Sequence, residues 1–155
     1  MPRFEKRSPM PASADDLYAW HMAPGALEKL LPPWQKVRIV EGPGQLEEGA
    51  IVVMKVYVGF VGLRWEALHR DFIAGRQFVD EQRKGPFRRW VHTHRFEPQD
   101  DGTSVLCDLI DYEPPLFPLG RIGTLAIRRM LTRMFEFRHR ATYDAMTAKA
   151  PLPSS

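Results

Sequence analysis

A run of strand-like segments separated by tight turns constrains the fold of this chain more than any other feature. Residues 50–112 are rich in β-branched and aromatic side chains, and short turns interrupt them at Gly75-Arg76, Gly85-Pro86 and Asp100-Asp101-Gly102. Turns of this length connect consecutive strands as hairpins. Because the strands of a hairpin are antiparallel neighbours, the segment predicts an antiparallel meander.

Helices flank this meander on both sides. Ser13 is a suitable N-cap for a helix over 13–21, and Pro24 suits the first turn of a second helix over 24–31, which Pro32-Pro33 ends. A proline-rich segment, 114–118, separates the meander from a long helix over 121–148. The strands, beginning with a first edge strand, are expected at residues 3–8, 34–40, 50–58, 63–74, 77–83, 87–97 and 103–112.

The long helix carries one apolar stripe. Its apolar residues recur at steps of three and four, which places them on one side of an α-helix. One face of the sheet and this stripe must bury each other. We therefore expect a single α+β domain over residues 1–149 and a disordered tail over 150–155. The stripe consists of Ile127, Met130, Leu131, Met134, Phe137, Ala141 and Ala145.

Charge and composition argue against several classes of function. The 155 residues carry a net charge of +3, and 44% of them are apolar, which is ordinary for one globular domain. Basic residues gather only in the last helix, where we interpret them as a solvated face rather than a site for phosphate or a membrane. Nucleic-acid binding is not expected. The arginines of this cluster are Arg121, Arg128, Arg129, Arg133, Arg138 and Arg140.

The single cysteine, Cys107, allows no intramolecular disulfide, and we interpret it as an inert buried residue. No apolar segment reaches the about 20 residues that span a bilayer. Residues 1–10 lack the apolar core of a signal peptide, so a cytoplasmic protein is expected. The sequence contains neither a P-loop nor a complete dinucleotide-binding motif, and no cofactor is expected.

The inner face of the predicted sheet holds an unusual number of polar side chains. Side chains alternate between the two faces of a strand, so the arginine- and glutamate-bearing positions belong in water and the aromatic ones face the helix. A polar group buried there without a partner costs about 1–3 kcal/mol. The set either forms a structural network or lines a wet cavity, and we favour the cavity. Its polar members are His69, Asp80, Gln82, His92, His94, Asp108 and Tyr112, and their face is shared by Trp65, Ala67, Asp71, Phe78, Trp90, Phe96 and Ile110.

A metal site is one possible use of these polar residues. His92 and His94 are two positions apart on one strand, so both can bind one ion, with His69 or Asp108 as a third ligand. Neither a cysteine pair nor a second pair of histidines at this spacing supports the ion. No metal is therefore expected.

Acid–base catalysis is the other possible use. A histidine paired with an aspartate, as His69 with Asp108 or His92 with Asp80, could act as a general base. Ser104 shares the parity of Asp108 and leaves a hydrolase triad open, although nothing in the sequence resembles a nucleophile elbow.

Four segments of the sequence share a pattern with one superfamily. They are Trp65-x-Ala67-x-His69; Phe78-x-Asp80-x-Gln82-x-x-Gly85-Pro86-Phe87-x-x-Trp90-x-His92-x-His94-x-Phe96; Asp108-x-Ile110-x-Tyr112; and Phe135-x-Phe137-Arg138. With them, nearly the whole chain resembles a bacterial branch of the START-like helix-grip superfamily (SRPBCC). That superfamily includes lipid-transfer START domains, birch-pollen-allergen-like proteins and polyketide cyclase/dehydrase-type domains. The resemblance implies a seven-stranded curved antiparallel sheet that grips a long C-terminal helix, with two short helices after the first strand.

The resemblance also implies a deep cavity between sheet and helix, but not one activity. We expect a module that binds a small hydrophobic or amphipathic ligand, such as a lipid, a sterol or a polyketide, rather than an enzyme. The alternatives are a cyclase/dehydrase-type enzyme, with His69, His92 or Asp108 in acid–base roles, and an adaptor that contacts a membrane surface or acidic partner through the basic last helix. The expected ligand-binding residues are Trp65, His69, Phe78, Asp80, Trp90, His92, His94, Phe96, Asp108, Tyr112, Leu131, Met134 and Phe137.

Overall fold

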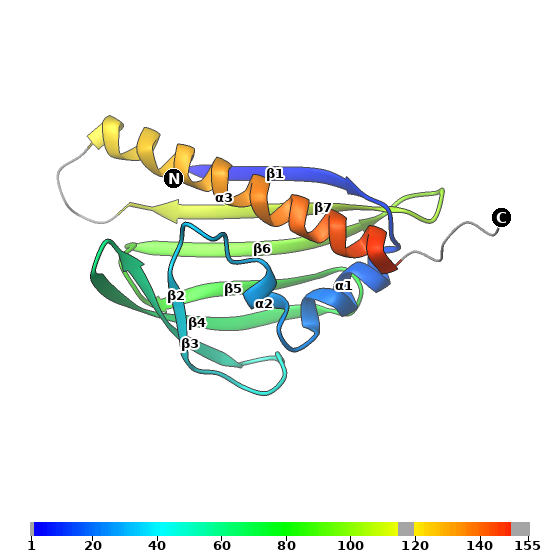
Figure 1. Ribbon diagram of the computed structural model, residues 1–155, viewed down its shortest axis with the longest axis horizontal. Helices are drawn as coiled ribbons and strands as arrows, with labels where there is room; N and C mark the ends of the chain where they lie inside the picture. Colours follow the sequence, from blue (N-terminus) through cyan, green and yellow to red (C-terminus); the bar gives the residue numbers. More distant parts are fainter. Residues whose placement is uncertain (1, 115–119, 150–155) are drawn as a thin grey trace.

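Seven antiparallel strands form one curved sheet in the order β1-β7-β6-β5-β4-β3-β2 (Figure 1). The computed structural model describes residues 2–114 and 120–149. The predicted fold class is confirmed, whereas the predicted disordered tail, 150–155, lies outside the described residues. The elements are β1 (Arg3–Met10), α1 (Ala14–Met22), α2 (Ala26–Lys29), β2 (Val37–Glu41), β3 (Ile51–Val58), β4 (Val61–Ile73), β5 (Gln77–Lys84), β6 (Arg89–Pro98), β7 (Ser104–Glu113) and α3 (Gly120–Lys149).

Each strand from β2 to β7 pairs with its neighbour in the chain, as the short turns predict. The exception is β1, which pairs with β7 and places Phe4 opposite Ile110. This pairing makes β1 an edge strand, as predicted, and brings the start of the domain beside its last strand. The sheet therefore presents one face to all three helices (Figure 1).

The residues at their N-caps determine where the two short helices begin. Ser13 caps α1, because its Oγ accepts a hydrogen bond from the Asp16 backbone N–H at 3.1 Å. α2 is shorter than the predicted 24–31. Gly25, with φ of 83°, lies in the left-handed region at the N-cap, so a helix cannot run through it from Pro24.

Two apolar clusters lie between the sheet and the helices. α1 contacts β6 and β7 over the first cluster, and α3 contacts β1 beside the second. The first consists of Met10, Ala14, Leu17, Trp20, Leu30, Phe78, Phe96, Leu106 and Met146. The second consists of Phe4, Trp90, Ile110, Tyr112, Leu131, Met134 and Phe135.

A bulge near the end of β4 overturns one prediction about the inner face. Asp71 was expected to share the face of His69, but it is exposed and has a φ of 55°. The pairing of β4 with β5 shifts between Arg70 and Ile73 at this point. A bulge adds a residue and so reverses the alternation. Phe72 takes the inward direction instead, and its ring stacks on Phe78 at 5.7 Å.

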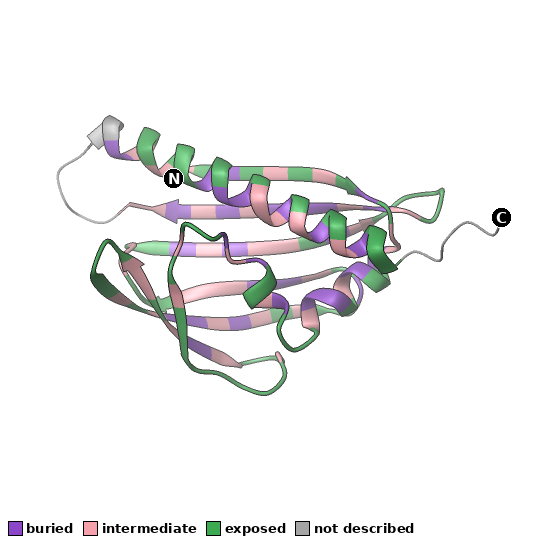
Figure 2. Ribbon diagram, viewed as in Figure 1, coloured by how far each residue is buried: buried purple, intermediate pink, exposed green. Residues whose placement is uncertain are grey.

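α3 buries one side along most of its length, and Figure 2 shows buried and exposed residues alternating along it. The predicted stripe is wrong at Met130, which is 46% exposed. The buried side instead runs through Leu131, Phe135, His139 and then Thr142, of which the last two are polar. A stripe drawn from apolar residues alone is therefore rotated away from the true one. In the part of the chain that the structure describes, no helix has the length and apolarity to cross a bilayer.

Candidate functional site

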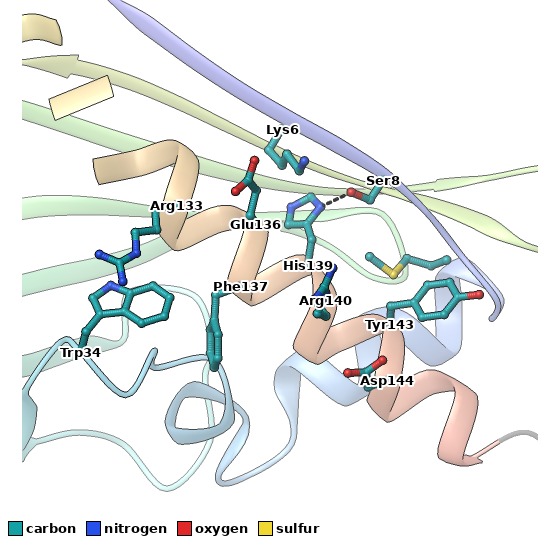
Figure 3. A pocket seen from close by; sticks show the side chains of 11 residues that line it. Lys6, Ser8, Trp34, Arg133, Glu136, Phe137, His139, Arg140, Tyr143 and Asp144 are labelled. Carbon is teal, nitrogen blue, oxygen red and sulfur yellow. Dashed lines mark hydrogen bonds between the residues drawn. The ribbon is translucent and has the colours of Figure 1, made fainter. Parts of the chain in front are cut away.

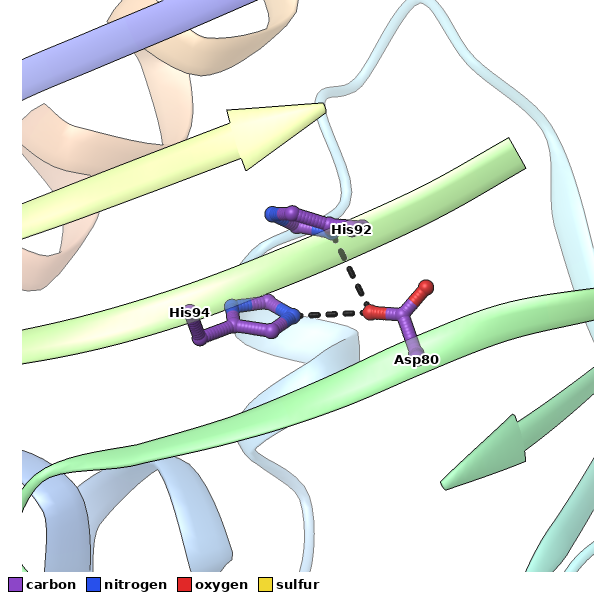
Figure 4. Close-up of side chains that lie close together, drawn as sticks. All are labelled: Asp80, His92 and His94. Carbon is purple, nitrogen blue, oxygen red and sulfur yellow. Dashed lines mark hydrogen bonds and ion pairs between the residues drawn. The ribbon is translucent and has the colours of Figure 1, made fainter. Parts of the chain in front are cut away.

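Four polar side chains meet at the centre of the inner face, between the two apolar clusters. His92 and His94 lie on β6, Asp80 on β5 and Asp108 on β7. The pairing of the strands places Asp80 opposite His92 and His94 opposite Asp108. The alternation of β6 turns both histidines to the same side, where Figure 4 shows them beside Asp80 of β5. Asp108 supplies a second carboxylate from β7. Strand register, which the sequence does not define, thus assembles the site.

The four side chains are linked in both directions. His92 Nε2 donates to Asp108 Oδ1 at 2.8 Å, and His94 Nε2 donates to Asp80 Oδ2 at 2.7 Å. The second nitrogen of each ring lies 3.1 Å from the other carboxylate, His92 Nδ1 beside Asp80 and His94 Nδ1 beside Asp108. The two imidazole rings have their centroids 3.7 Å apart and are tilted by 39° to each other. Each histidine therefore bridges both aspartates.

The network continues from the sheet to α3 and the edge strand through His139. His139 Nε2 donates to Asp108 Oδ2 at 2.7 Å, and its Nδ1 lies 2.8 Å from Ser8 Oγ on β1. The sequence analysis missed both residues. His139 follows Phe135 by four positions and Leu131 by eight, so helical spacing could have placed it on the buried side.

Burial and pairing shift the charges of this network in opposite directions. Burial alone would lower the pKa of His92, but the carboxylates of Asp80 and Asp108 outweigh it and raise that pKa to about 9. Burial alone would raise the pKa of each aspartate, but the histidines bonded to it hold the pKa of Asp80 and of Asp108 well below its usual value. At neutral pH an imidazolium therefore lies between two carboxylates.

Two further histidines on the inner side stay uncharged. Burial lowers the pKa of His69, whose Nδ1 lies 3.4 Å from the Ala50 carbonyl oxygen. Burial also lowers the pKa of His21 to about 4, and its Nδ1 donates to the Leu17 carbonyl at 2.8 Å. Of the two predicted pairs, the structure brings His92 to Asp80, whereas His69 turns to Ala50 and not to Asp108.

Ser104, considered as a nucleophile, serves the fold instead. It is fully buried, and its hydroxyl donates to the Ala12 carbonyl at 2.7 Å. This bond fixes the chain between β1 and α1 to β7. The hydroxyl therefore points to the backbone and not to a histidine.

The predicted apolar residues divide between the two sides of the network. Phe78 stacks on the ring of His94 at 4.1 Å, next to Phe96 at 6.1 Å. On the other side Trp90 meets Trp65 edge-on at 5.2 Å and lies near Tyr112 at 6.4 Å. Leu131 and Met134 join this second group from α3. Phe137 stands apart from both groups and packs against Trp34.

A groove of about 800 Å³ runs along α3 (Figure 3). Of the predicted ligand-binding residues, only Phe137 lines it. The groove meets the network at Ser8 and His139, which contact each other on its wall. Its lining residues are Lys6, Ser8, Met10, Trp34, Arg133, Glu136, Phe137, His139, Arg140, Tyr143 and Asp144.

The same network offers the atoms of a metal site. Ligand atoms of Asp80, His92 and His94 lie within 4.8 Å of one another, so Asp80 takes the place that was predicted for His69 or Asp108. A metal binds neutral imidazole. An ion here would have to displace the proton that the two carboxylates hold on His92. The arrangement therefore favours a network of ion pairs at neutral pH.

The fold and the family agree with the sequence pattern. A curved seven-stranded antiparallel sheet that holds a long C-terminal helix, with short helices after its first strand, defines a START-like helix-grip protein. The family model for polyketide cyclase/dehydrase and lipid transport matches residues 10–136. The chain belongs to this family.

Solved structures share the fold at low sequence identity. A nucleoside-diphosphate sugar epimerase from Corynebacterium glutamicum superposes with a TM-score of 0.72 and 22% identity, over 93% of this chain and 29% of that chain. A START superfamily protein from Mycobacterium smegmatis gives 0.71 and 14%, over 96% and 99%. The Zhui aromatase/cyclase from Streptomyces sp. R1128 gives 0.65 and 19%, over 96% and 92%. No curated protein matches the sequence.

Proposed function

We propose that this protein binds a small hydrophobic or amphipathic ligand, of lipid, sterol or polyketide type, between the sheet and α3. One observation carries the proposal: a paired polar network lies at the centre of an otherwise aromatic inner face, and part of that face stays accessible. Binding sites for small molecules typically combine apolar walls with a few polar groups that orient the ligand. The family description, which includes lipid transport, supports the same reading.

The accessible part of the inner face lies over the middle strands. α3 contacts β1, so it covers that edge of the sheet more closely than β3, β4 and β5. The inward side chains of Met54, Trp65 and Asp80 are only partly buried. Apolar area that a ligand covers here contributes about 25 cal/mol per Å². In this proposal Trp65 and Met54 supply apolar area, and Asp80 with His94 supplies the polar end.

A thermal-shift and native mass spectrometry panel of fatty acids, sterols and aromatic polyketides tests the proposal. At least one class should raise the melting temperature and remain bound in the native spectrum. Trp65→Ala and His94→Ala should weaken that binding several-fold, whereas Thr93→Ala, which changes the outward neighbour of His94, should not. Retention of full affinity in both inward variants would refute the proposed site.

A second candidate function is cyclase/dehydrase-type catalysis. The pKa values of two histidines on either side of Asp80 move in opposite directions, down for His69 and up for His92. A neutral imidazole can accept a proton and an imidazolium can donate one, so the pair suits a general base and a general acid. The enzyme reading predicts a bell-shaped pH–rate profile on an aromatic polyketide substrate. Loss of its acidic limb in His69→Ala, with substrate binding retained, would separate turnover from binding alone.

A further inference from the structure

Among the arginines of α3 whose side chains the structure describes, Arg138 alone is not exposed. Arg128, Arg129, Arg133 and Arg140 are exposed, as a solvated face requires. Arg138 belongs to the same predicted cluster, but its guanidinium lies 5.2 Å from the ring of Phe135, which is almost fully buried. The prediction of a solvated side chain is therefore wrong for Arg138. Its position follows from helical spacing, because it lies between the buried side chains of Met134 and Thr142.

The Nε–H of Arg138 is a buried donor without an acceptor. Its Nε is inaccessible to solvent and has no hydrogen-bond partner among the residues that the structure describes. The next residue of α3, His139, bonds to Asp108, so the helix passes beside the polar network at this point. Burial lowers the pKa of Arg138, while the charges of Asp108 and Asp80 oppose that shift. A guanidinium carries its donors in a fixed plane and stays protonated. Buried donors in proteins are nearly always paired, so the unpaired Nε–H of Arg138 is an exception that a bound acceptor would remove.

We infer that Arg138 recognises an acceptor oxygen of the ligand, either a carbonyl or a carboxylate, at the end of the apolar binding site. The inference rests on the proposed function and adds the chemistry of the ligand's polar end. The carboxylates of Asp80 and Asp108 accept hydrogen bonds. They therefore cannot bind an acceptor oxygen of the ligand directly. The histidines of the network already donate to those carboxylates. Among the buried side-chain polar atoms that the structure describes, the Nε of Arg138 is thus the one whose N–H has no acceptor.

Two matched ligand series test the inference by isothermal titration calorimetry. One consists of undecanoic acid, methyl nonyl ketone and undecane, and the other of naphthoic acid, acetylnaphthalene and ethylnaphthalene. Within a series the hydrocarbon lacks the acceptor oxygen. A hydrogen bond from a charged donor should make an acceptor-bearing member bind about 10- to 100-fold more tightly than its hydrocarbon. Whether the acid or the ketone gains more identifies a carboxylate or a neutral carbonyl as the natural head group.

The variants assign this preference to one side chain. Arg138→Leu should abolish the advantage of the acceptor-bearing ligands and leave hydrocarbon binding within about twofold. Arg138→Lys keeps the charge but lacks the Nε–H, and it should retain only part of the advantage. Arg129→Leu, an exposed position on the same helix, is the matched control and should bind like the natural chain. Circular dichroism and the melting temperature establish that each variant is folded.

The outcomes distinguish this inference from the proposed function. Equal binding of hydrocarbon and acceptor-bearing ligands, or a preference that survives in Arg138→Leu, overturns the inference and leaves the proposed function standing. Binding of no member of either series, together with a negative lipid and sterol panel, overturns both. A preference that only Arg138 variants lose supports both.

Discussion

The two faces of the sheet both carry paired charges, but their surroundings differ. On the outer face Arg3 contacts Asp111 at 2.7 Å and Arg70 contacts Glu81 at 2.8 Å, with all four side chains partly in water. On the inner face His92 contacts Asp108 at the same 2.8 Å, yet the two side chains are 3% and 6% exposed. Ion pairs of similar length can therefore contribute very different free energies to folding, depending on their exposure to water.

The difference in exposure decides how much each kind of ion pair contributes to stability. An ion pair at the surface keeps most of its hydration and contributes at most about 1 kcal/mol. A buried pair loses that hydration, and well-packed apolar side chains of similar volume often stabilise a fold as well or better. The outer pairs can therefore be replaced with little change in the free energy of unfolding. For the inner network, stability alone is a weak explanation, which agrees with the ligand-binding role proposed above.

The largest effect is expected when one carboxylate of the inner network is removed. Asp108→Leu removes the acceptor of His92 Nε2 and of His139 Nε2, and breaking a buried ion pair by removing one partner costs about 3–5 kcal/mol. Urea denaturation should show this loss in the free energy of unfolding. A loss below about 1 kcal/mol would place the inner pairs in the same class as the outer ones.

The next effect is a pH dependence that belongs to the inner face. The pKa of His92 is about 9 in the folded protein, against the ordinary 6.5, so its protonated form stabilises the fold. This contribution is complete below pH 6.5 and disappears as the pH rises towards 9, a decrease on the order of 3 kcal/mol. His69 and His21 have lowered pKa values and titrate below this window. Unfolding free energies measured across the window should fall in the natural chain and stay flatter in His92→Leu.

The smallest effect is expected on the outer face. Glu81→Gln removes the carboxylate that Arg70 Nε contacts, and both side chains are about one-third exposed. The free energy of unfolding should change by less than about 1 kcal/mol, and moderate salt should reduce the difference further. A salt-independent loss of several kcal/mol would contradict the contrast between the faces.

The sequence is informative wherever simple alternation holds. Counting by twos along β5, β6 and β7 places Asp80, His92, His94 and Asp108 on one face, which the structure confirms. The same count fails at Asp71, because a bulge depends on one backbone conformation with positive φ. It also leaves register open, and so could not select His92–Asp80 over His69–Asp108.

The helical part of the site was harder to predict. A search for apolar residues at helical spacing finds Leu131 and Met134, but it passes over His139 and Arg138, which are polar and point inward. The direction of His139 depends on partners that lie far away in the sequence, such as Asp108 on β7. Helix periodicity limits the candidates, and only tertiary contact identifies them.

The pairing of β1 with β7 limits the order in which the segments of this protein can fold. A ribosome delivers β1 first, yet its partner strand follows about a hundred residues later, after the whole meander. Contacts between such distant segments form late, because a long loop must close first. Ser8 and His139, which are 131 positions apart, complete the polar network only once β1, β7 and α3 have all met. The nascent chain thus forms its sheet before it completes this network.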